Sequence, residues 1–285
     1  IEEADIILKA ENCDIQLSIL TSDLIQVKMI RPSEVIVDSI AIYKKDWELP
    51  ELKISEYNDY LKVETEKLMI NVKYEPYSLT VYDLEEDLIL ADDDGPAFED
   101  GGSKIRVKKS LSQDEKFYGL GERTGLLNKR GEEHELWNFD QSSPHVHNTK
   151  HMYKSIPFLI GLKDKKSYGL FFDNTYRTRF DLGKESEDYF SFEADGGGLS
   201  YYIFYGPSIK DVVQRYTELT GRMELPPMWA TGFQQCRYSY YPEEKVREIA
   251  NTFREKEIPC DVIYLDIDYM DEYRVFTCDD DKFPA

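Results

Sequence analysis

The chain has 285 residues and 41% of them are hydrophobic, which suffices for one large domain or two ordinary domains with a core. Its net charge of −21 excludes nucleic acid and anionic membranes as partners, because phosphate groups would be repelled. The four cysteines (Cys13, Cys236, Cys260 and Cys278) show no C-x-x-C spacing, so we predict neither a zinc site nor a disulfide framework.

The first residues, Ile1 to Ala4, lack the basic and apolar pattern of a signal sequence, and no run of about 18 apolar residues is present. We therefore expect a cytoplasmic protein, although a processed secreted chain would look the same. The 21 Tyr, 14 Phe and 3 Trp suit a neutral partner such as a sugar, and they suit equally the core of a β-rich protein.

Short apolar stretches separated by turn residues dominate the first part of the chain. Between Asp5 and about Leu90 they are DIILKA, IQLSIL, LIQVKMI, EVIVDSIAIY, YLKVET and LMINVKY, and similar segments return from Phe158 to Tyr205. This spacing predicts an antiparallel β-sandwich over residues 1–207. Composition predicts a turn or mobile loop over the acidic residues 91–102, where a metal site is the alternative without the spacing of a calcium loop.

Two motifs within the sandwich region invite a ligand assignment. Residues 118–125, YGLGERTG, lack the glycine spacing of a dinucleotide fingerprint, so we expect these glycines to serve backbone turns.

All four histidines lie between His134 and His151. His145 and His147 could share a metal, but no further ligand follows at a zinc spacing, so we expect ordinary histidines in a partly solvated loop and no metal.

A helix is predicted over residues 208–224, linking two domains. Ser208 and Asp211 have capping-box spacing, an apolar face runs from Ile209 to Leu219, and Gly221 follows. Trp229 to Asp271 then has the pattern strand, loop, helix, strand. Apolar residues at helical spacing follow Pro242, and the run Val262 to Leu265 is typical of a strand buried on both faces. We predict a βαβ unit with parallel strands.

Polar residues gather where both predicted strands end. Arg237 and Tyr238 follow the first strand, while Asp266 and Asp268 follow the second. In parallel α/β folds ligands bind at this edge. For Asp266 the alternative is a cap or an ion pair with Arg237, and for Tyr238 it is packing between layers.

The run from Gly232 to Thr277, with its D-I-D-Y-M-D element, resembles the start of the catalytic barrel of glycoside hydrolase family 31, and specifically its α-glucosidases. FYGLGERTG, ELWNFDQ and ELPPMWATGF occur upstream in the order that the family shows, so the resemblance covers about Phe117 to the end. It implies an α+β multidomain fold: an antiparallel β-sandwich with a substrate-facing loop at about 131–151, then the first βαβ unit of a (β/α)8 TIM barrel over residues 225–285.

The resemblance implies the amino-terminal portion of a retaining, exo-acting α-glucosidase, in which two aspartates on later strands act about 5–5.5 Å apart. No W-x-D-M motif for the nucleophile occurs here, and a complete barrel takes roughly 250 residues, so we expect one piece of a larger enzyme and no catalytic residue in this chain. Binding residues are what it can supply. Asp266, Tyr238 and Ile267 match the pocket for the terminal glucose, and Asp140 matches an acidic contact in the +1 subsite.

Three functions remain open at this point. They are an α-glucosidase, an α-glucan lyase or α-xylosidase of the same family, and a non-catalytic carbohydrate-binding module. No cofactor is expected. The expected partners are an α-linked oligosaccharide and the remainder of the barrel, and a homo-oligomer stays open.

Overall fold

The computed structural model describes residues 5–9, 13–31, 39–99 and 104–284. The chain divides into two compact units, residues 1–222 and 223–285. It is mostly β-sheet with few helices, and no helix among the described residues is long and apolar enough to cross a membrane.

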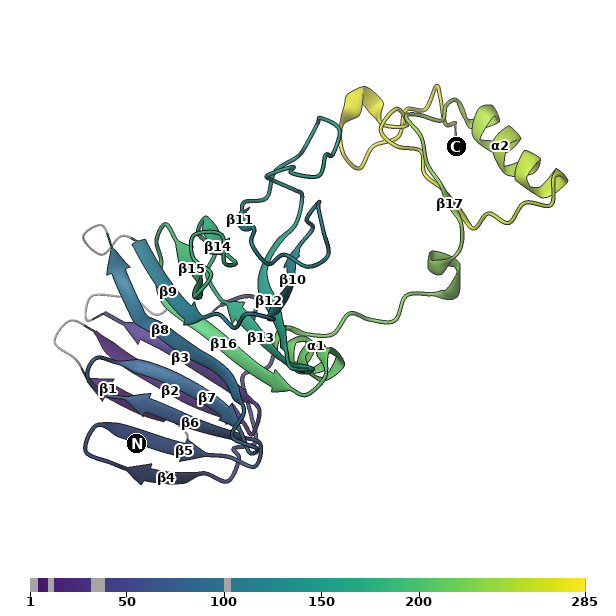
Figure 1. The fold of residues 1–285 in the computed structure, drawn as a ribbon. Coiled ribbons are helices and arrows are strands. Elements are labelled where there is room, and N and C mark those ends of the chain that lie inside the picture. Colours follow the sequence, from purple (N-terminus) through teal and green to yellow (C-terminus); the bar gives the residue numbers. More distant parts are fainter. Residues whose placement is uncertain (1–4, 10–12, 32–38, 100–103, 285) are drawn as a thin grey trace. The chain divides into compact units, whose positions relative to one another are not determined.

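The first unit contains two antiparallel sheets (Figure 1). The seven-stranded sheet has the order β1-β2-β3-β16-β13-β12-β10, formed by Asp5–Lys9, Asp14–Thr21, Leu24–Ile30, Leu199–Gly206, Lys166–Phe172, Ser155–Lys163 and Lys116–Gly121. The nine-stranded sheet has the order β11-β14-β15-β9-β8-β7-β6-β5-β4, formed by Glu133–Leu136, Thr178–Asp181, Tyr189–Ala194, Lys104–Ser110, Leu88–Glu99, Ser78–Asp83, Leu68–Lys73, Tyr60–Glu64 and Lys53–Glu56.

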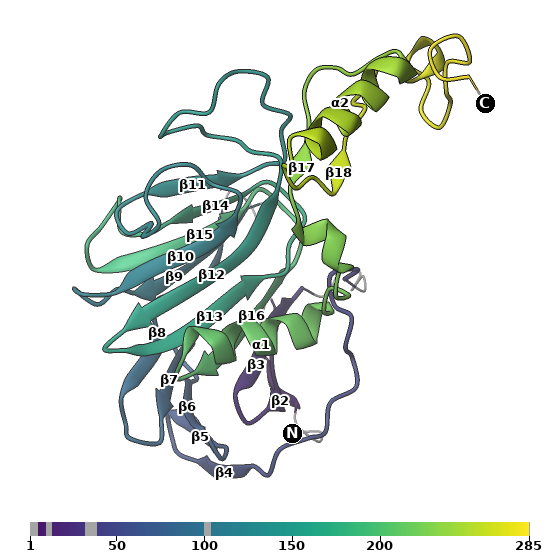
Figure 2. The ribbon, with the colours of Figure 1, turned by 90° about the vertical axis from the view of Figure 1, so that its right-hand side faces the viewer.

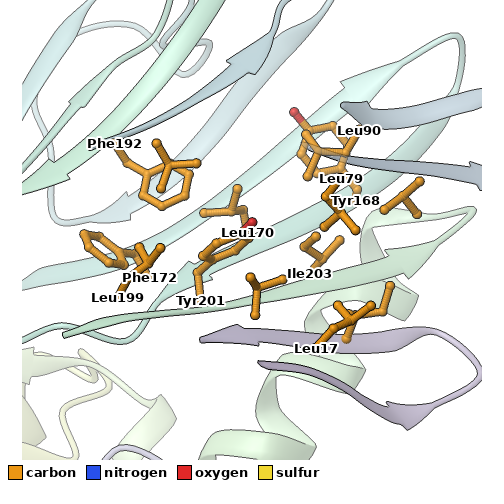
Figure 3. Close-up of a cluster of buried hydrophobic side chains, with 14 of the residues drawn as sticks. Leu17, Leu79, Leu90, Tyr168, Leu170, Phe172, Phe192, Leu199, Tyr201 and Ile203 are labelled. Atoms are coloured by element: carbon orange, nitrogen blue, oxygen red, sulfur yellow. The ribbon is translucent and has the colours of Figure 1, made fainter. Parts of the chain in front are cut away.

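The core lies between these sheets because alternate residues of each strand point inward. In β9, for example, Ile105 and Val107 are fully buried while their neighbours are half-exposed. Figure 3 shows apolar side chains from both sheets meeting in this core, among them Leu17, Leu79 and Phe192.

The acidic stretch that we predicted as a turn or mobile loop is largely a strand, so that prediction was wrong for residues 91–99. These residues belong to β8, and residues 100–102 lie outside the described part of the chain. The physical reason is Asp92, whose side chain is fully buried beside that of Lys109 on β9, with 2.5 Å between carboxylate oxygen and Nζ. Register shifts around Asp94 accommodate the remaining acidic residues.

A second predicted strand, within EVIVDSIAIY, is absent where the structure can be described. Residues 34–38 lie outside the described part, and residues 39–43 form a turn and an irregular segment. The backbone N–H groups of Tyr43 and Lys44 donate to the carbonyl of Leu219 at 2.9 and 3.1 Å. This segment therefore caps the carboxyl end of a helix instead of extending a sheet.

That helix is α1, Ile209–Thr220, which begins at the predicted capping box of Ser208 and Asp211. It belongs to the first unit and packs on the seven-stranded sheet (Figure 2). Val212 and Leu219 are fully buried there, and the ring of Tyr216 stacks on that of Phe158 with centroids 3.8 Å apart. The predicted linking helix is thus part of the sandwich layer.

The second unit is a βαβ motif, as predicted from the sequence. Strands β17 (Gln234–Gln235) and β18 (Val262–Ile263) are parallel, and α2 (Glu243–Glu255) lies between them in the chain with Pro242 at its N-cap. Two short 3₁₀ helices, Met228–Thr231 and Asp271–Tyr273, complete it. Trp229 therefore lies in a helical turn and not in the predicted strand.

The strand predicted to be buried on both faces is only half-buried, and within the described part of this unit it pairs only with β17 in a two-stranded sheet. The ring of Phe253 on α2 contacts that of Phe233 with centroids 5.9 Å apart. This contact uses the apolar helix face that the spacing predicted.

Candidate substrate-binding site

Asp266 lies at the carboxyl end of β18, three residues after Ile263, and its side chain is exposed. Its backbone has φ 65, in the left-handed region that only a few per cent of non-glycine residues adopt. Such conformations cluster at functional sites, where the surrounding contacts hold them in place. Among the described residues the Asp266 carboxylate has no hydrogen-bond or ion-pair partner, so its oxygens are free to accept bonds from a ligand.

The two alternatives for Asp266 are not observed. The guanidinium of Arg237 lies 5.6 Å from the ring centroid of Tyr240 and forms no ion pair with Asp266. Asp266 also caps no helix in the described chain. Neither alternative therefore explains the position of this exposed carboxylate.

Tyr238 follows β17 and is 70% exposed, so packing between layers does not explain it. The next residue, Ser239, donates its hydroxyl to the carbonyl of Leu265 at 3.2 Å. This hydrogen bond joins the loop that carries Tyr238 to the residue directly before Asp266. Ile267 comes next and is half-buried. The structure thus brings the loops of all three predicted residues together at one edge of the parallel pair.

Asp268 was named at this edge without a role, and the structure shows that it is 9% exposed. The hydroxyl of Tyr273 donates to its carboxylate at 3.0 Å, and Lys282 Nζ donates to its backbone carbonyl at 3.2 Å. The D-I-D spacing gave no signal for this difference, because residues two apart share a face of an extended strand and the backbone leaves the strand conformation at Asp266. The sequence carries no signal for Lys282 either.

Asp140 belongs to the first unit and lies in an exposed loop after β11. The base of this loop is fixed by backbone contacts: Phe139 N donates to Met152 O at 3.1 Å, and Ser155 N donates to Asn138 Oδ1 at 2.7 Å. The side chains of Trp137 and Phe139 are 44% and 49% exposed. The guanidinium of Arg177 lies over the Trp137 ring, 4.6 Å from its centroid. The exposed carboxylate of Asp140 is a group suited to accepting bonds from sugar hydroxyls.

Glu135 organises the same loop and was missed in the sequence. It is buried, and its carboxylate lies 2.6 Å from His151 Nε2, 3.3 Å from Lys150 Nζ and 3.5 Å from Arg179 Nε. Burial alone would raise the pKa of Glu135, but the bonds from His151 and Lys150 outweigh it and lower the pKa. Only the fold shows this, because the four residues are spread over 45 positions of the sequence.

His145 and His147, the pair that we weighed as a metal site, take part in hydrogen bonds within the protein. His145 Nε2 lies 3.1 Å from the Tyr153 hydroxyl, and the carbonyl of His147 accepts from Thr124. His134 differs from the partly solvated residue that we predicted, since it lies in β11 and burial lowers its pKa to about 4. Among the described residues the group closest to a metal-ligand set is Asp83, Glu85 and Asp87, and Lys166 Nζ already lies within 2.6 Å of each carboxylate.

The glycines of YGLGERTG serve backbone geometry: Gly125 lies in a bend after β10 with φ 89, whereas the first two glycines lie in a strand bulge and not in a turn. Gly119 and Gly121 lie in β10 with φ 109 and 78, on either side of a register shift against β12. A Cβ on either glycine would come within 2.5 Å of a carbonyl oxygen, of Phe158 or of Lys154. The motif therefore needs glycine for close strand approach.

Comparison with known proteins assigns both units. Residues 14–181 match the glycosyl hydrolase 31 N-terminal galactose mutarotase-like domain, and residues 223–285 match the TIM-barrel domain of glycosyl hydrolases family 31. Alpha-glucosidase 2 of Bacillus thermoamyloliquefaciens is 39% identical over 277 residues, which are 96% of this chain and 35% of that protein. Alpha-xylosidase XylQ of Lactiplantibacillus pentosus is 36% identical over 180 residues, which are 62% of this chain and 23% of that one.

A solved family 31 dextranase of Flavobacterium johnsoniae, complexed with isomaltotriose, superimposes with a TM-score of 0.90 and 35% identity over 98% of this chain and 34% of that chain. The chain thus spans about a third of the length of these relatives. Both family models and the shared fold lead to one conclusion: this chain belongs to glycoside hydrolase family 31.

Proposed function

We propose that the chain is the amino-terminal portion of a retaining, exo-acting α-glucosidase that hydrolyses terminal α-linked glucose from oligosaccharides. The observation that carries the proposal is the free Asp266 carboxylate at the carboxyl end of β18, beside the loop of the exposed Tyr238. In a family 31 protein, this carboxylate would accept hydrogen bonds from the hydroxyls of the terminal glucose. Tyr238 and Ile267 would form the aromatic and apolar walls of the pocket.

The catalytic steps require two carboxyl groups, a nucleophile and an acid/base, at about 5–5.5 Å separation. We propose that both belong to barrel strands of the complete enzyme, of which residues 223–285 form the first βαβ unit. Support comes from the match to the TIM-barrel family model and from the third of the relatives' length that the chain spans. The substrate is then an α-linked oligosaccharide, and we propose that Asp140 contacts the sugar that departs.

We further propose a cytoplasmic location. All four cysteines are free, which supports this proposal. Fractionation of the producing cells, with the chain detected by antibody, tests this placement. Recovery in the secreted fraction would contradict it.

Product analysis with the complete enzyme tests the reaction. Maltose should yield glucose with retained α-configuration at early times. A dehydrated sugar would identify an α-glucan lyase, and preference for an α-xyloside would identify an α-xylosidase, the activity that the name of one relative carries. Isomaltotriose should be included because a dextranase is among the most similar structures. Absence of any product would favour a carbohydrate-binding module.

A further inference from the structure

The segment after β18 folds back on itself and is held by a few contacts. Asp279 N donates to the carbonyl of Tyr269 at 2.8 Å, and Asp271 N donates to Thr277 Oγ1 at 3.1 Å. Glu272, Tyr273 and Phe276 have positive φ values of 48, 60 and 63, so this segment does not follow a regular element. Its shape therefore depends on specific side-chain contacts.

Lys282 contacts several parts of this unit. Its ammonium group lies 2.9 Å from Asp279 Oδ2, donates to the backbone carbonyl of Asp268 at 3.2 Å, and lies 5.5 Å from the ring centroid of Tyr241. Its own carbonyl accepts the N–H of Glu243, the first residue of α2, at 3.0 Å. One residue thus joins the segment after β18, the loop after β17 and the start of α2.

These contacts involve residues close in the sequence to Asp266 and Tyr238 of the predicted glucose pocket. Asp268 lies two residues after Asp266, and Tyr241 lies three residues after Tyr238. On the other side, the Ser239 hydroxyl holds the carbonyl of Leu265. The backbone on both sides of Asp266 is therefore joined to the loop after β17. Leu265 makes this connection on one side through Ser239, and Asp268 makes it on the other side through Lys282.

We propose that Lys282 is a positioning residue for substrate binding, which fixes Asp266 relative to Tyr238 by tying the backbone at Asp268 to the loop after β17. The proposal rests on the function proposed above. Lys282 does not touch the Asp266 carboxylate, so it acts through the backbone and not as a ligand to the sugar.

The charge of Lys282 suits this task. The hydrogen bond to Asp279 raises the pKa of Lys282, and so the ammonium stays protonated at physiological pH. The side chain is 36% exposed, and ion pairs of that exposure contribute little to stability. An effect of Lys282 on activity would therefore come from geometry, because a misplacement of about 1 Å in a site can cost a large factor in rate.

The test is a double-mutant cycle in the complete enzyme, with kcat and KM measured on maltose for the wild type, Asp266→Asn, Lys282→Met and the double variant. We expect Lys282→Met to lower kcat/KM by about tenfold, chiefly through KM. In the Asp266→Asn background the same change should cost less than about threefold, because the residue that it positions is already impaired.

Three further variants control for structure. Lys282→Arg keeps a cationic donor and should restore most of the loss, while Asp279→Asn keeps an acceptor without the charge and should cost about threefold. Lys245→Met removes an ammonium whose partner is Glu248 on the exposed face of α2, and it should leave kcat/KM unchanged. If Lys282→Met fails to fold, Asp279→Asn carries the same cycle with Asp266→Asn.

Additive losses in the cycle, or wild-type kinetics for Lys282→Met, would overturn the positioning role while leaving the proposed function intact. Unchanged kinetics for Asp266→Asn would overturn the proposed pocket and this inference with it. An equal loss of kcat/KM with Lys282→Arg and with Lys282→Met would also contradict the proposal, because the proposal requires that any cationic donor at this position restores most of the activity.

Discussion

At the scale of single residues, the sandwich contains an ion pair that water does not reach. The side chains of Asp92 and Lys109 are both fully buried, Lys109 Nζ donates to the Tyr201 hydroxyl at 3.1 Å, and Leu79 N donates to Asp92 Oδ2 at 2.7 Å. Burying two charges costs free energy that their mutual attraction and hydrogen bonds must offset. Because Asp92 and Lys109 are paired in register, the pair also fixes β8 against β9 where β8 is irregular.

Lys109→Met should therefore lower the free energy of unfolding by about 3–5 kcal/mol, since it leaves Asp92 buried without a counter-charge. Adding Asp92→Asn should recover part of this loss, because the amide oxygen can still accept from Leu79. Urea denaturation followed by circular dichroism measures both variants. Lys108→Met, on the other face of the strand, should cost less than about 1 kcal/mol, and an equal cost for both lysines would contradict the role of the buried pair.

His134 makes stability depend on pH. Burial lowers its pKa to about 4, so the unfolded chain, with a pKa near 6.5, binds a proton that the folded chain does not bind between these values. Stability should be fully present above pH 6.5 and fall as the pH drops toward 4, by about 2 kcal/mol after allowance for the nearby Glu132 carboxylate and for solvent screening.

Urea midpoints between pH 4 and 7 test this dependence in the wild type and in His134→Gln. The variant should have a flatter profile over this range. His145→Gln, which changes an exposed histidine, should keep the wild-type slope. Parallel profiles for the wild type and His134→Gln would show that another group is responsible.

At the scale of elements, the loop from Trp137 to Tyr153 is held by Glu135, which lies in β11 at its base. Glu135→Gln should weaken the bonds to His151, Lys150 and Arg179 together, because a neutral amide replaces the carboxylate. We expect faster amide hydrogen exchange over residues 137–153 and unchanged exchange in the core strands. Glu187→Gln, at an exposed position without such contacts, serves as the control. Unchanged exchange in Glu135→Gln would contradict the role of Glu135 in holding this loop.

The same loop carries Asp140, for which we predict a contact with the departing sugar. Asp140→Ala in the complete enzyme should lower kcat/KM more on maltose than on an aryl glucoside, since only maltose places a sugar in the +1 subsite. A difference of about tenfold between the two losses is expected for one charged hydrogen bond. Equal losses on the two substrates would remove Asp140 from that subsite.

Elements with strong local signals could be predicted from the sequence. The capping box of α1, Pro242 before α2 and the alternation in β2, β3 and β5 each specify structure within a few residues. Residues 91–99 and 39–43 were mispredicted because distant partners decide them: Lys109 stabilises the acidic strand, and Leu219 at the end of α1 takes the N–H groups of Tyr43 and Lys44. Such tertiary contacts override local composition.

In the candidate site, too, residues with a local sequence signal could be predicted and residues defined by tertiary contacts could not. Asp266, Tyr238, Ile267 and Asp140 stood in recognisable motifs, and the structure places the first three on adjoining loops. Asp268, Glu135 and Lys282 contact residues outside their own motifs, namely Tyr273, Arg179 and Asp268 respectively, so no local pattern predicts these contacts. The positive φ of Asp266 was also invisible in the sequence.

At the scale of the whole molecule, a two-sheet β-sandwich precedes a βαβ motif in the described residues. The sandwich has its own core between two sheets. The βαβ unit exposes large apolar side chains, including Phe276 at 99% and Tyr238 at 70%. On our account these 285 residues bind the sugar, and chemistry requires the carboxyl groups of later barrel strands.

The most direct test of this account is the kinetic effect of Asp266→Asn in the complete enzyme on maltose. The neutral amide removes charged hydrogen bonds to the terminal glucose that act in both the ground state and the transition state, so kcat/KM should fall by about 10- to 100-fold. Asp280→Asn changes an exposed aspartate that has no hydrogen bond or ion pair through its side chain among the described residues, and it should retain wild-type kinetics. Wild-type kcat and KM for Asp266→Asn would contradict the central claim, because the free carboxylate at the end of β18 would then not contact the substrate.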